Sequence, residues 1–312
     1  MYSLGIDTSN YTTSVALYDS DSDSIVQLKK LLPVKEGEKG IRQSDAVFHH
    51  TVQLSPLLTE LFADNQIKID AVGYSEKPRN AEGSYMPCFK AGENTALSIS
   101  AVSGVPAFAF SHQCNHIAAA LFSSGKFGEL KNEEFIAFHI SGGTTEMLYV
   151  KPDREKFFDV TIIGKTLDLN AGQAIDRAGL MLGLKFPCGA ELEKLALNSD
   201  KEFKPHIHFE NGCCSLSGIE NKCAKMIESN EPFCDVAKFC IDSIYEAIRL
   251  MTQYAVSQYG SLPLIYAGGV MSDSIIRKRI ENEFSGVFSM PEYSCDNAAG
   301  NALMAYERCV NK

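Results

Sequence analysis

The histidines of the segment His112-Gln-Cys-Asn-His116 have the spacing of a metal-binding pair. They are four positions apart, so on a helix both imidazoles project from one face, where two nitrogens can bind one cation. A further ligand must come from elsewhere, and Asp296 is the best candidate, although it could also be the N-cap of the last helix. Two histidines and one carboxylate suit iron or zinc with open positions. The alternative is two polar residues at the start of an amphipathic helix.

Two turns rich in hydroxyl groups or glycine could bind phosphate. The first, residues 7–13 (DTSNYTT), offers backbone N–H groups and hydroxyls such as that of Ser9, while Asp7 could hold a hydrated Mg²⁺. The second, residues 141–145 (SGGTT), has glycines that let a ligand approach the backbone closely. Either turn alone could be a solvated hairpin tip. One such turn in each half of the chain predicts a clamp for ATP.

Other glycine and acidic positions could complete a nucleotide site. Gly268 and Gly269 follow a hydrophobic strand and precede a helix, where glycine lets an adenosine lie against the backbone. Strand-to-helix turns also use glycine when they bind nothing. Gly172 and Asp176 share a helix face, and Asp176 could accept a hydrogen bond from a ribose hydroxyl. The alternative is an acidic first turn favoured by the helix dipole.

The elements that must position these residues alternate between strands and helices. We expect strands on both sides of the turn 7–13, and at 69–74, 105–112, 135–140, 146–152 and 263–270. We expect helices at 44–66, 93–103, 112–124, 170–184, 234–258, from about 272, and at 296–309, and a long polar loop at 75–92. This alternation predicts an α/β fold, and the repeated strand–turn–strand plan suggests two related halves. We place the lobes at 1–125 and 126–312, with the last helix returning to the N-terminal lobe.

Composition narrows the class of protein. A chain of 312 residues with 45% hydrophobic residues suits two domains. With 29 Lys and Arg against 39 Asp and Glu, the net charge is −10, so binding RNA would need a local basic patch or a basic partner. The ten cysteines form no CxxC pair, which favours buried thiols in a reducing compartment. The chain begins without a signal-like segment and has no membrane-length apolar run, so we expect a soluble, cytoplasmic protein.

In order along the chain, these segments resemble the TsaD family of the ASKHA superfamily, once called Gcp or O-sialoglycoprotein endopeptidase. GIDTSNYTTSVALYD resembles the family's GIETSCDET, HQCNH matches its HxxxH motif, and SGGTTEM resembles SGGHTQ. LDLNAGQAIDRAGLMLGLKFPCGAELEKLA resembles its DDAAGEAFDKxAxxLGLxYPGGP block, and SLSGIENK, AGGVMSDS and CDNAAGNALMAYE resemble FSGLK, AGGVSAN and CTDNGAMIAY. The resemblance implies a two-lobed, actin- and Hsp70-like fold of two duplicated RNase H-like domains with a nucleotide cleft between them.

The resemblance also implies an acyltransferase that moves a threonylcarbamoyl group from its adenylate to N6 of adenosine 37 in tRNA. It implies one iron or zinc ion per chain, held by His112, His116 and Asp296, and ATP or an acyl-adenylate as ligand. Because the chain is acidic, we expect any tRNA to be bound through partner proteins, in a homodimer or a heteromeric complex, and we expect no membrane contact. The residues that would contact the nucleotide, by position in the family motifs, are Ile140, Ser141, Gly142, Gly143, Asp176, Gly189 and, where the family has Asn, Asp273.

Several positions around the expected nucleotide site depart from the family pattern. The family's GPG(L) turn is absent, and the segment 75–92 in its place carries Lys77, Arg79 and Lys90. Thr144 stands where the family has His, Leu169 where it has Asp, and Asp273 where it has Asn. The pair Tyr11-Thr12 stands where the family has two acidic residues. The metal triad is intact. This combination favours a divergent paralogue.

Two alternatives follow from these departures. The first is another metal-dependent, carbamoyl-type transfer to a different substrate, with Lys77, Arg79 and Lys90 holding a different anion. The second is a non-catalytic ATP-binding partner protein. A metallopeptidase is least favoured, because HQCNH lacks the Glu that HExxH enzymes use as a base.

Overall fold

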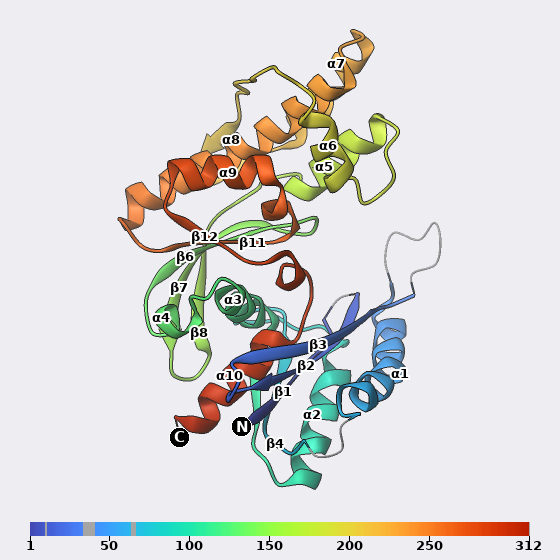
Figure 1. The fold of residues 1–312 in the computed structure, drawn as a ribbon, viewed down its shortest axis with the longest axis vertical. Helices are drawn as coiled ribbons and strands as arrows, with labels where there is room; N and C mark the ends of the chain where they lie inside the picture. The colour runs from blue at the N-terminus through green and yellow to red at the C-terminus, as the bar shows by residue number, and fades with distance from the viewer. Residues whose placement is uncertain (10, 34–40, 64–66, 312) are drawn as a thin grey trace. The chain divides into compact units, whose positions relative to one another are not determined.

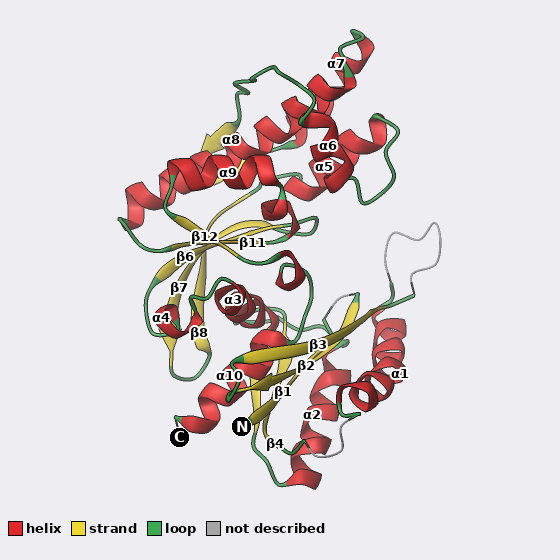
Figure 2. Cartoon of the chain, in the orientation of Figure 1, coloured by secondary structure: helices red, strands yellow, loops and turns green. Residues whose placement is uncertain are grey.

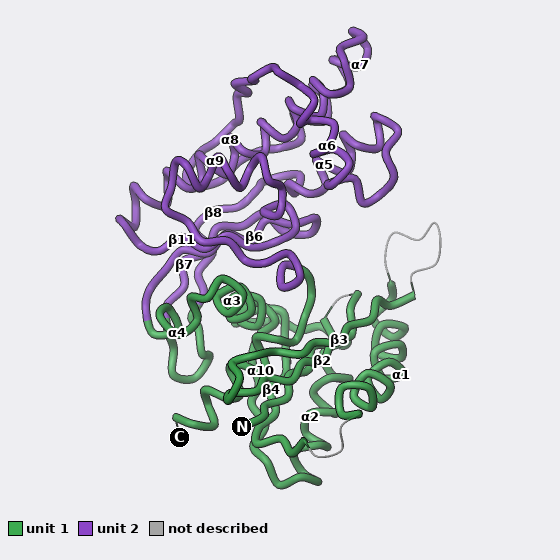
Figure 3. Tube along the Cα trace, in the orientation of Figure 1, with its two compact units in different colours: residues 1–132, 152–159, 295–312 green, residues 133–151, 160–294 purple. Residues whose placement is uncertain are grey.

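The computed structural model describes residues 1–9, 11–33, 41–63 and 67–311. Asn10 of the expected phosphate turn and the end of the expected helix 44–66 lie outside the described residues. The chain forms two compact units (Figure 3). Unit 1 comprises residues 1–132, 152–159 and 295–312, and unit 2 comprises residues 133–151 and 160–294. The domain boundary at residues 125 and 126 stays a prediction.

Unit 1 contains a mixed five-stranded sheet (Figure 1). Its strands are β1 (Tyr2–Asp7), β2 (Thr12–Asp19), β3 (Ser24–Leu31), β4 (Ile69–Lys77) and β5 (Ala107–Ser111), in the order β3-β2-β1-β4-β5. The first three are antiparallel, whereas β1, β4 and β5 run parallel. Because parallel strands end at the same edge, the turn after β1 and the helix after β5 start at that edge.

Helices cover both faces of this sheet. Figure 1 shows α1 (Gln43–Leu61) and α2 (Phe89–Ser103) on one face, and α3 (His112–Ser123) and α10 (Ala299–Val310) on the other. The short α4 (Phe127–Leu130) follows α3. Glycines let α10 approach the strands: a Cβ on Gly5 would lie 2.2 Å from the Ala298 carbonyl oxygen, and one on Gly73 would lie 2.1 Å from that of Asn301. The end of the chain is thereby joined to its first strand.

Unit 2 repeats the sheet of unit 1. Its strands are β6 (Phe135–Ile140), β7 (Thr145–Asp153), β8 (Phe157–Lys165), β11 (Leu264–Ala267) and β12 (Gly286–Phe288), in the order β12-β11-β6-β7-β8. Read from β8 to β12, the strands β8, β7, β6, β11 and β12 correspond in turn to β3, β2, β1, β4 and β5 of unit 1. β6 is antiparallel to β7 and parallel to β11, just as β1 is antiparallel to β2 and parallel to β4. The expected duplication is therefore confirmed.

The helices of unit 2 bury one side of this sheet. Figure 2 shows α8 (Phe233–Tyr259) and α9 (Ser274–Glu283) lying along it, and their apolar residues join those of β6 in one core. The remaining elements of unit 2 are α5 (Ala171–Met181), α6 (Gly189–Ala196), α7 (Ser217–Glu228), β9 (His208–Glu210), β10 (Cys213–Ser215) and the 3-10 turns η1 (Gly269–Ser272) and η2 (Pro291–Tyr293). Among the described helices, none has both the length and the apolar character needed to cross a membrane.

Several predicted element boundaries are wrong, and two of them concern residues of the expected sites. The polar segment 75–92 is not one loop: β4 continues to Lys77 and α2 begins at Phe89, so Lys77 lies in a strand and Lys90 in a helix. The last helix begins at Ala299 rather than at Asp296. The side chain of Asn297 accepts a hydrogen bond from the Ala299 N–H at 3.0 Å, so Asn297, and not Asp296, binds the start of α10.

Candidate metal centre and nucleotide pocket

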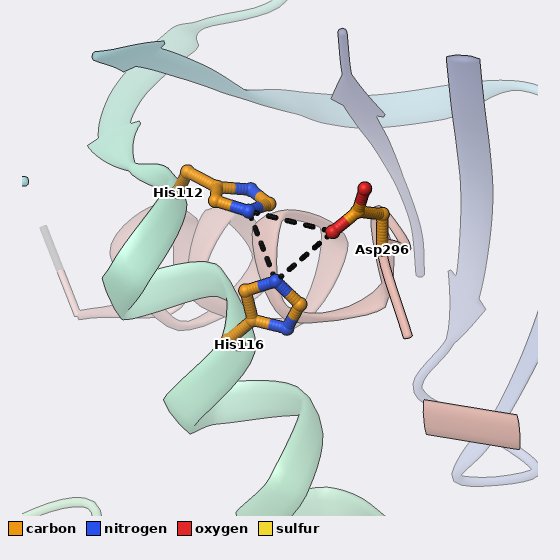
Figure 4. A group of neighbouring side chains, drawn as sticks. All are labelled: His112, His116 and Asp296. Atoms are coloured by element: carbon orange, nitrogen blue, oxygen red, sulfur yellow. Dashed lines mark hydrogen bonds and ion pairs between the residues drawn. The ribbon is translucent and has the colours of Figure 1, made fainter. Parts of the chain in front are cut away.

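The two histidines and Asp296 converge in unit 1. Figure 4 shows the three side chains pointing toward one another. Nε2 of His112 lies 2.9 Å from Nε2 of His116, and Oδ1 of Asp296 lies 3.7 and 3.5 Å from these two nitrogens. Bonds of about 2.0–2.2 Å to one ion place its ligands roughly 3.0–3.5 Å apart. The donor types and their spacing therefore fit a transition metal.

Local structure explains how the histidines reach this geometry. Ser111 ends β5 and is the N-cap of α3, accepting a hydrogen bond from the Cys114 N–H at 3.2 Å. His112 is then the first residue of the helix, and His116 follows one turn later on the same face. The helix thus begins at the metal site.

Asp7 is a component of this site that the sequence does not reveal. It ends β1, is fully buried, and accepts a hydrogen bond from Nδ1 of His112 at 2.9 Å. It also accepts hydrogen bonds from the Ser9 N–H at 2.9 Å and from the hydroxyls of Ser9 and Ser75. The carboxylate is thus committed to protein donors rather than to a hydrated Mg²⁺, and it holds His112 with Nε2 directed at the triad.

The charges of this pair support each other. Burial raises the pKa of Asp7, but the charge and hydrogen bond of His112, together with the hydrogen bonds of Ser75 and Ser9, lower it to about 2. Burial lowers the pKa of His112, and the charge and hydrogen bond of Asp7 raise it overall. Asp7 is therefore an anion at neutral pH.

Asn115, between the histidines, ties α3 to the segment that carries Asp296. Its side-chain Nδ2 donates to the backbone carbonyl oxygen of Asn297 at 2.5 Å. Its side-chain Oδ1 accepts from the backbone N–H of Asn301 at 2.8 Å. Asn115 is fully buried, so these bonds have no competition from water. One amide side chain thereby links the helix of the two histidines to the distant segment that carries Asp296.

Unit 2 contains a pocket of about 390 Å³. It brings together five of the residues predicted to bind nucleotide: Gly142, Asp176, Gly189, Gly269 and Asp273. Gly172, Ile175, Pro187, Ala190, Glu193, Val270 and Ser272 complete its lining. Such a volume suits part of a nucleotide.

The glycine turn beside this pocket is supported by two close contacts. A Cβ on Gly172 would lie 2.6 Å from the Gly142 nitrogen, so glycine is required where α5 meets the turn. Gly268 has a φ of 103°, and a Cβ there would lie 2.2 Å from the Ile140 carbonyl oxygen. Ser141 closes the turn, its hydroxyl accepting hydrogen bonds from the N–H groups of Gly143 and Thr144 at 3.3 and 3.1 Å.

Carboxylates distinguish this pocket. Asp176 accepts a hydrogen bond from the Cys188 N–H at 2.8 Å, and Glu193 accepts one from the Ser274 N–H at 2.9 Å. Asp273 caps α9, accepting from the N–H groups of Ile275 and Ile276 at 3.0 Å each. Burial and the charges of Glu193 and Asp242 raise the pKa of Asp273, while its hydrogen bonds to the helix N–H groups lower it. The net result is a pKa of about 6.

The other predicted residues do not line this pocket. Asp7 and Ser9 belong to unit 1, beside the metal triad. The cations of the segment 75–92 also belong to unit 1, where Lys77 pairs with Glu76 at 2.8 Å and Lys90 pairs with Glu93 at 2.5 Å. The Arg79 N–H donates to the Ser84 hydroxyl at 3.0 Å.

Two units with one strand order, each flanked by helices, define the ASKHA class of folds. Solved structures agree: the activator of the 2-hydroxyisocaproyl-CoA dehydratase from Clostridium difficile, with bound ADPNP, is similar over 100% of this chain and 96% of its own, with a TM-score of 0.53 and 14% identity. Component A of the (R)-2-hydroxyglutaryl-CoA dehydratase from Acidaminococcus fermentans covers 99% of both chains, with a TM-score of 0.55 and 15% identity. At such identities the likeness shows the fold alone.

The family follows from the sequence comparison. Residues 28–303 match the model of the TsaD family, tRNA N6-adenosine threonylcarbamoyltransferase, and the chain belongs to that family. A relative named tRNA N6-adenosine threonylcarbamoyltransferase, from Buchnera aphidicola subsp. Schizaphis graminum, is 29% identical over 97% of this chain and 90% of its own length. The resemblance expected from the motifs is confirmed.

Proposed function

We propose that this chain is a metal-dependent acyltransferase that moves a threonylcarbamoyl group from its adenylate to N6 of adenosine 37 in tRNA. One observation supports this most strongly. His112, His116 and Asp296 offer three ligand atoms within 4.8 Å of one another, in a chain of the TsaD family.

The ligands proposed for iron or zinc are Nε2 of both histidines and Oδ1 of Asp296. A bound ion would supply Lewis acidity toward a carbamoyl or phosphate oxygen. The contribution of the chain is to keep its ligands in the binding form. Asp7 accepts the Nδ1 proton of His112, which leaves Nε2 as the free lone pair.

The proposed site for the adenylate is the pocket of unit 2. Gly142, Gly172 and Gly269 allow close approach to the backbone, and Asp176 is placed to accept a ribose hydroxyl. The backbone N–H of Gly142 is the donor proposed for the phosphate, because the N–H groups of Gly143 and Thr144 already donate to the Ser141 hydroxyl. The mixed anhydride of an acyl-adenylate is already activated, so the protein needs no Ser or Cys nucleophile and acts mainly by positioning.

The test uses tRNA from cells that lack this chain. Mass spectrometry of the nucleosides should show loss of threonylcarbamoyladenosine, restored by the wild-type chain and not by His112→Ala or His116→Ala. His208→Ala, an exposed histidine of unit 2, is the matched control and should restore it fully. Persistence of the modification in cells with no other enzyme for it would disprove the assignment.

A second candidate is transfer of a related carbamoyl-type group to a different substrate. The observation that favours it is the acidic pocket lining, where Asp176, Glu193 and Asp273 surround the expected nucleotide. Carboxylates repel a phosphate-bearing ligand. Tight binding of an uncharged nucleoside together with failure to bind AMP or ATP, measured by calorimetry, would favour this candidate.

A further inference from the structure

A second cavity lies in unit 1, apart from the metal triad, and it is basic. Its volume is about 770 Å³, and its charged lining consists of Lys131, Arg154, Arg308, Asp153 and Glu307. Three cations against two anions give it a net positive lining in a chain whose net charge is −10. Cations gathered at one place on an acidic protein indicate an anionic ligand.

The two carboxylates of this cavity are already engaged. Glu307 pairs with Lys131 at 2.6 Å, and Asp153 accepts hydrogen bonds from the N–H groups of Glu155 and Lys156 at 2.8 and 2.6 Å. Among the described residues, no carboxylate lies within ion-pair distance of Arg154 or Arg308. The two guanidinium groups therefore carry the excess positive charge, which the nearby charge of Asp153 partly offsets at Arg308.

Arg308 has an unsatisfied donor. Its Nη1 donates to the Arg154 carbonyl oxygen, whereas Nη2 is shielded from solvent and has no hydrogen-bond partner within the described chain. A charged donor that is buried without an acceptor destabilises the fold. An anion in the cavity is attracted by the charge of this guanidinium group, and a rotation of the side chain would bring Nη2 to it.

The cavity wall is built on a strained hairpin. Phe157, after the turn between β7 and β8, has a φ of 71°, a left-handed conformation that residues with a side chain rarely adopt. Its ring stacks on that of Phe127 at 6.2 Å and lies 5.8 Å from the guanidinium carbon of Arg308. Next to it, the Phe158 carbonyl oxygen accepts from the Asn80 amide at 3.3 Å and the Cys114 thiol at 3.5 Å. The hairpin is thus joined to α3, the helix that carries both histidines.

We propose that this cavity binds one nucleotide of the RNA acceptor, with a backbone phosphate held by Arg154 and Arg308. The inference rests on the proposed function, because an acidic chain that modifies RNA needs a local basic contact. The volume suits a nucleotide, and Pro152 and Phe157 supply apolar wall against which a base can lie.

The test compares Arg154→Gln with Lys156→Gln, two single-charge losses in one hairpin. Arg154 is exposed and lines the cavity, whereas Lys156 is exposed, pairs with Asp159 at 3.0 Å and does not line it. Binding of the full chain to a tRNA transcript is measured by fluorescence anisotropy from low to moderate salt. Arg154→Gln should weaken binding about 3- to 10-fold and lower the salt slope by about one, as expected for one lost phosphate contact. Lys156→Gln should change the affinity less than about twofold.

Three outcomes would overturn the proposal: wild-type affinity in Arg154→Gln, equal weakening by both variants, and no binding of the transcript by the wild-type chain. A transfer assay separates this proposal from the function itself. Arg154→Gln should raise KM for tRNA and leave kcat at the wild-type value. A wild-type chain that binds the transcript but transfers nothing would disprove the function and leave the RNA site standing.

Discussion

Replacing Asp273 by Asn should stabilise unit 2 at neutral pH and have almost no effect in acid. Asp273 is 8% exposed, and its pKa is raised from 3.8 to about 6, mainly by burial. The folded protein therefore binds this proton more tightly than the unfolded chain does. The associated stability is present below pH 3.8 and is lost as the pH rises through 6. A difference of about 2 pKa units corresponds to roughly 3 kcal/mol, the upper limit of the penalty at pH 7.

Asparagine has no charge to bury, and its oxygen can still accept the hydrogen bonds from Ile275 and Ile276 that cap α9. In calorimetric melting of the full chain at pH 7.5, the substitution should raise the melting temperature of unit 2 by about 2–4 °C for each kcal/mol gained. At pH 4 the shift should nearly vanish. Asp200→Asn, an exposed change in the same unit, is the control. A shift for Asp273→Asn that is equal at both pH values would refute the reasoning.

Three further substitutions test other contacts. Asp7→Asn should reduce metal affinity about 10- to 100-fold, because it weakens the bond that orients His112; bound metal is measured by plasma mass spectrometry after dialysis. Wild-type metal content would contradict this role for Asp7. Gly172→Ala should impair nucleotide binding in calorimetry, because its Cβ would displace the Gly142 backbone; unchanged affinity would count against the pocket. Gly73→Ala should destabilise unit 1 by about 1–3 kcal/mol in urea unfolding, since its Cβ would press into the α10 backbone, and an unaltered midpoint would exclude that clash.

The sequence predicts those features whose signal is local. His112 and His116 share one helix turn, so their spacing alone places both imidazoles on one face. The same holds for the strand before each glycine turn. The edge strand β3 is missed, because its largely exposed residues, including two adjacent lysines, do not alternate between apolar and polar. The three-residue β12 is too short to show any period.

Contacts between distant positions are beyond such patterns. Asp7 looks like a turn residue in the sequence, and only the parallel pairing of β1, β4 and β5 brings it to the start of α3. Asn115 likewise looks like a spacer between two histidines until α10 is in place. A residue that orients another through a long-range hydrogen bond leaves no periodic trace along the chain.

The metal and nucleotide sites therefore tolerate change differently. The triad lies beside a buried hydrogen-bond network, in which Asp7, Ser75, Asn115 and Asn301 form one connected set and Asp7 also bonds to His112. Changing any member leaves a buried polar group unsatisfied, which costs about 1–3 kcal/mol. In the pocket of unit 2, by contrast, Asp176 and Asp273 accept hydrogen bonds from backbone N–H groups, and Glu193 accepts from the N–H and the hydroxyl of Ser274. Many polar side chains could accept such bonds. We therefore expect the lining of this pocket to tolerate substitution better than the surroundings of the triad.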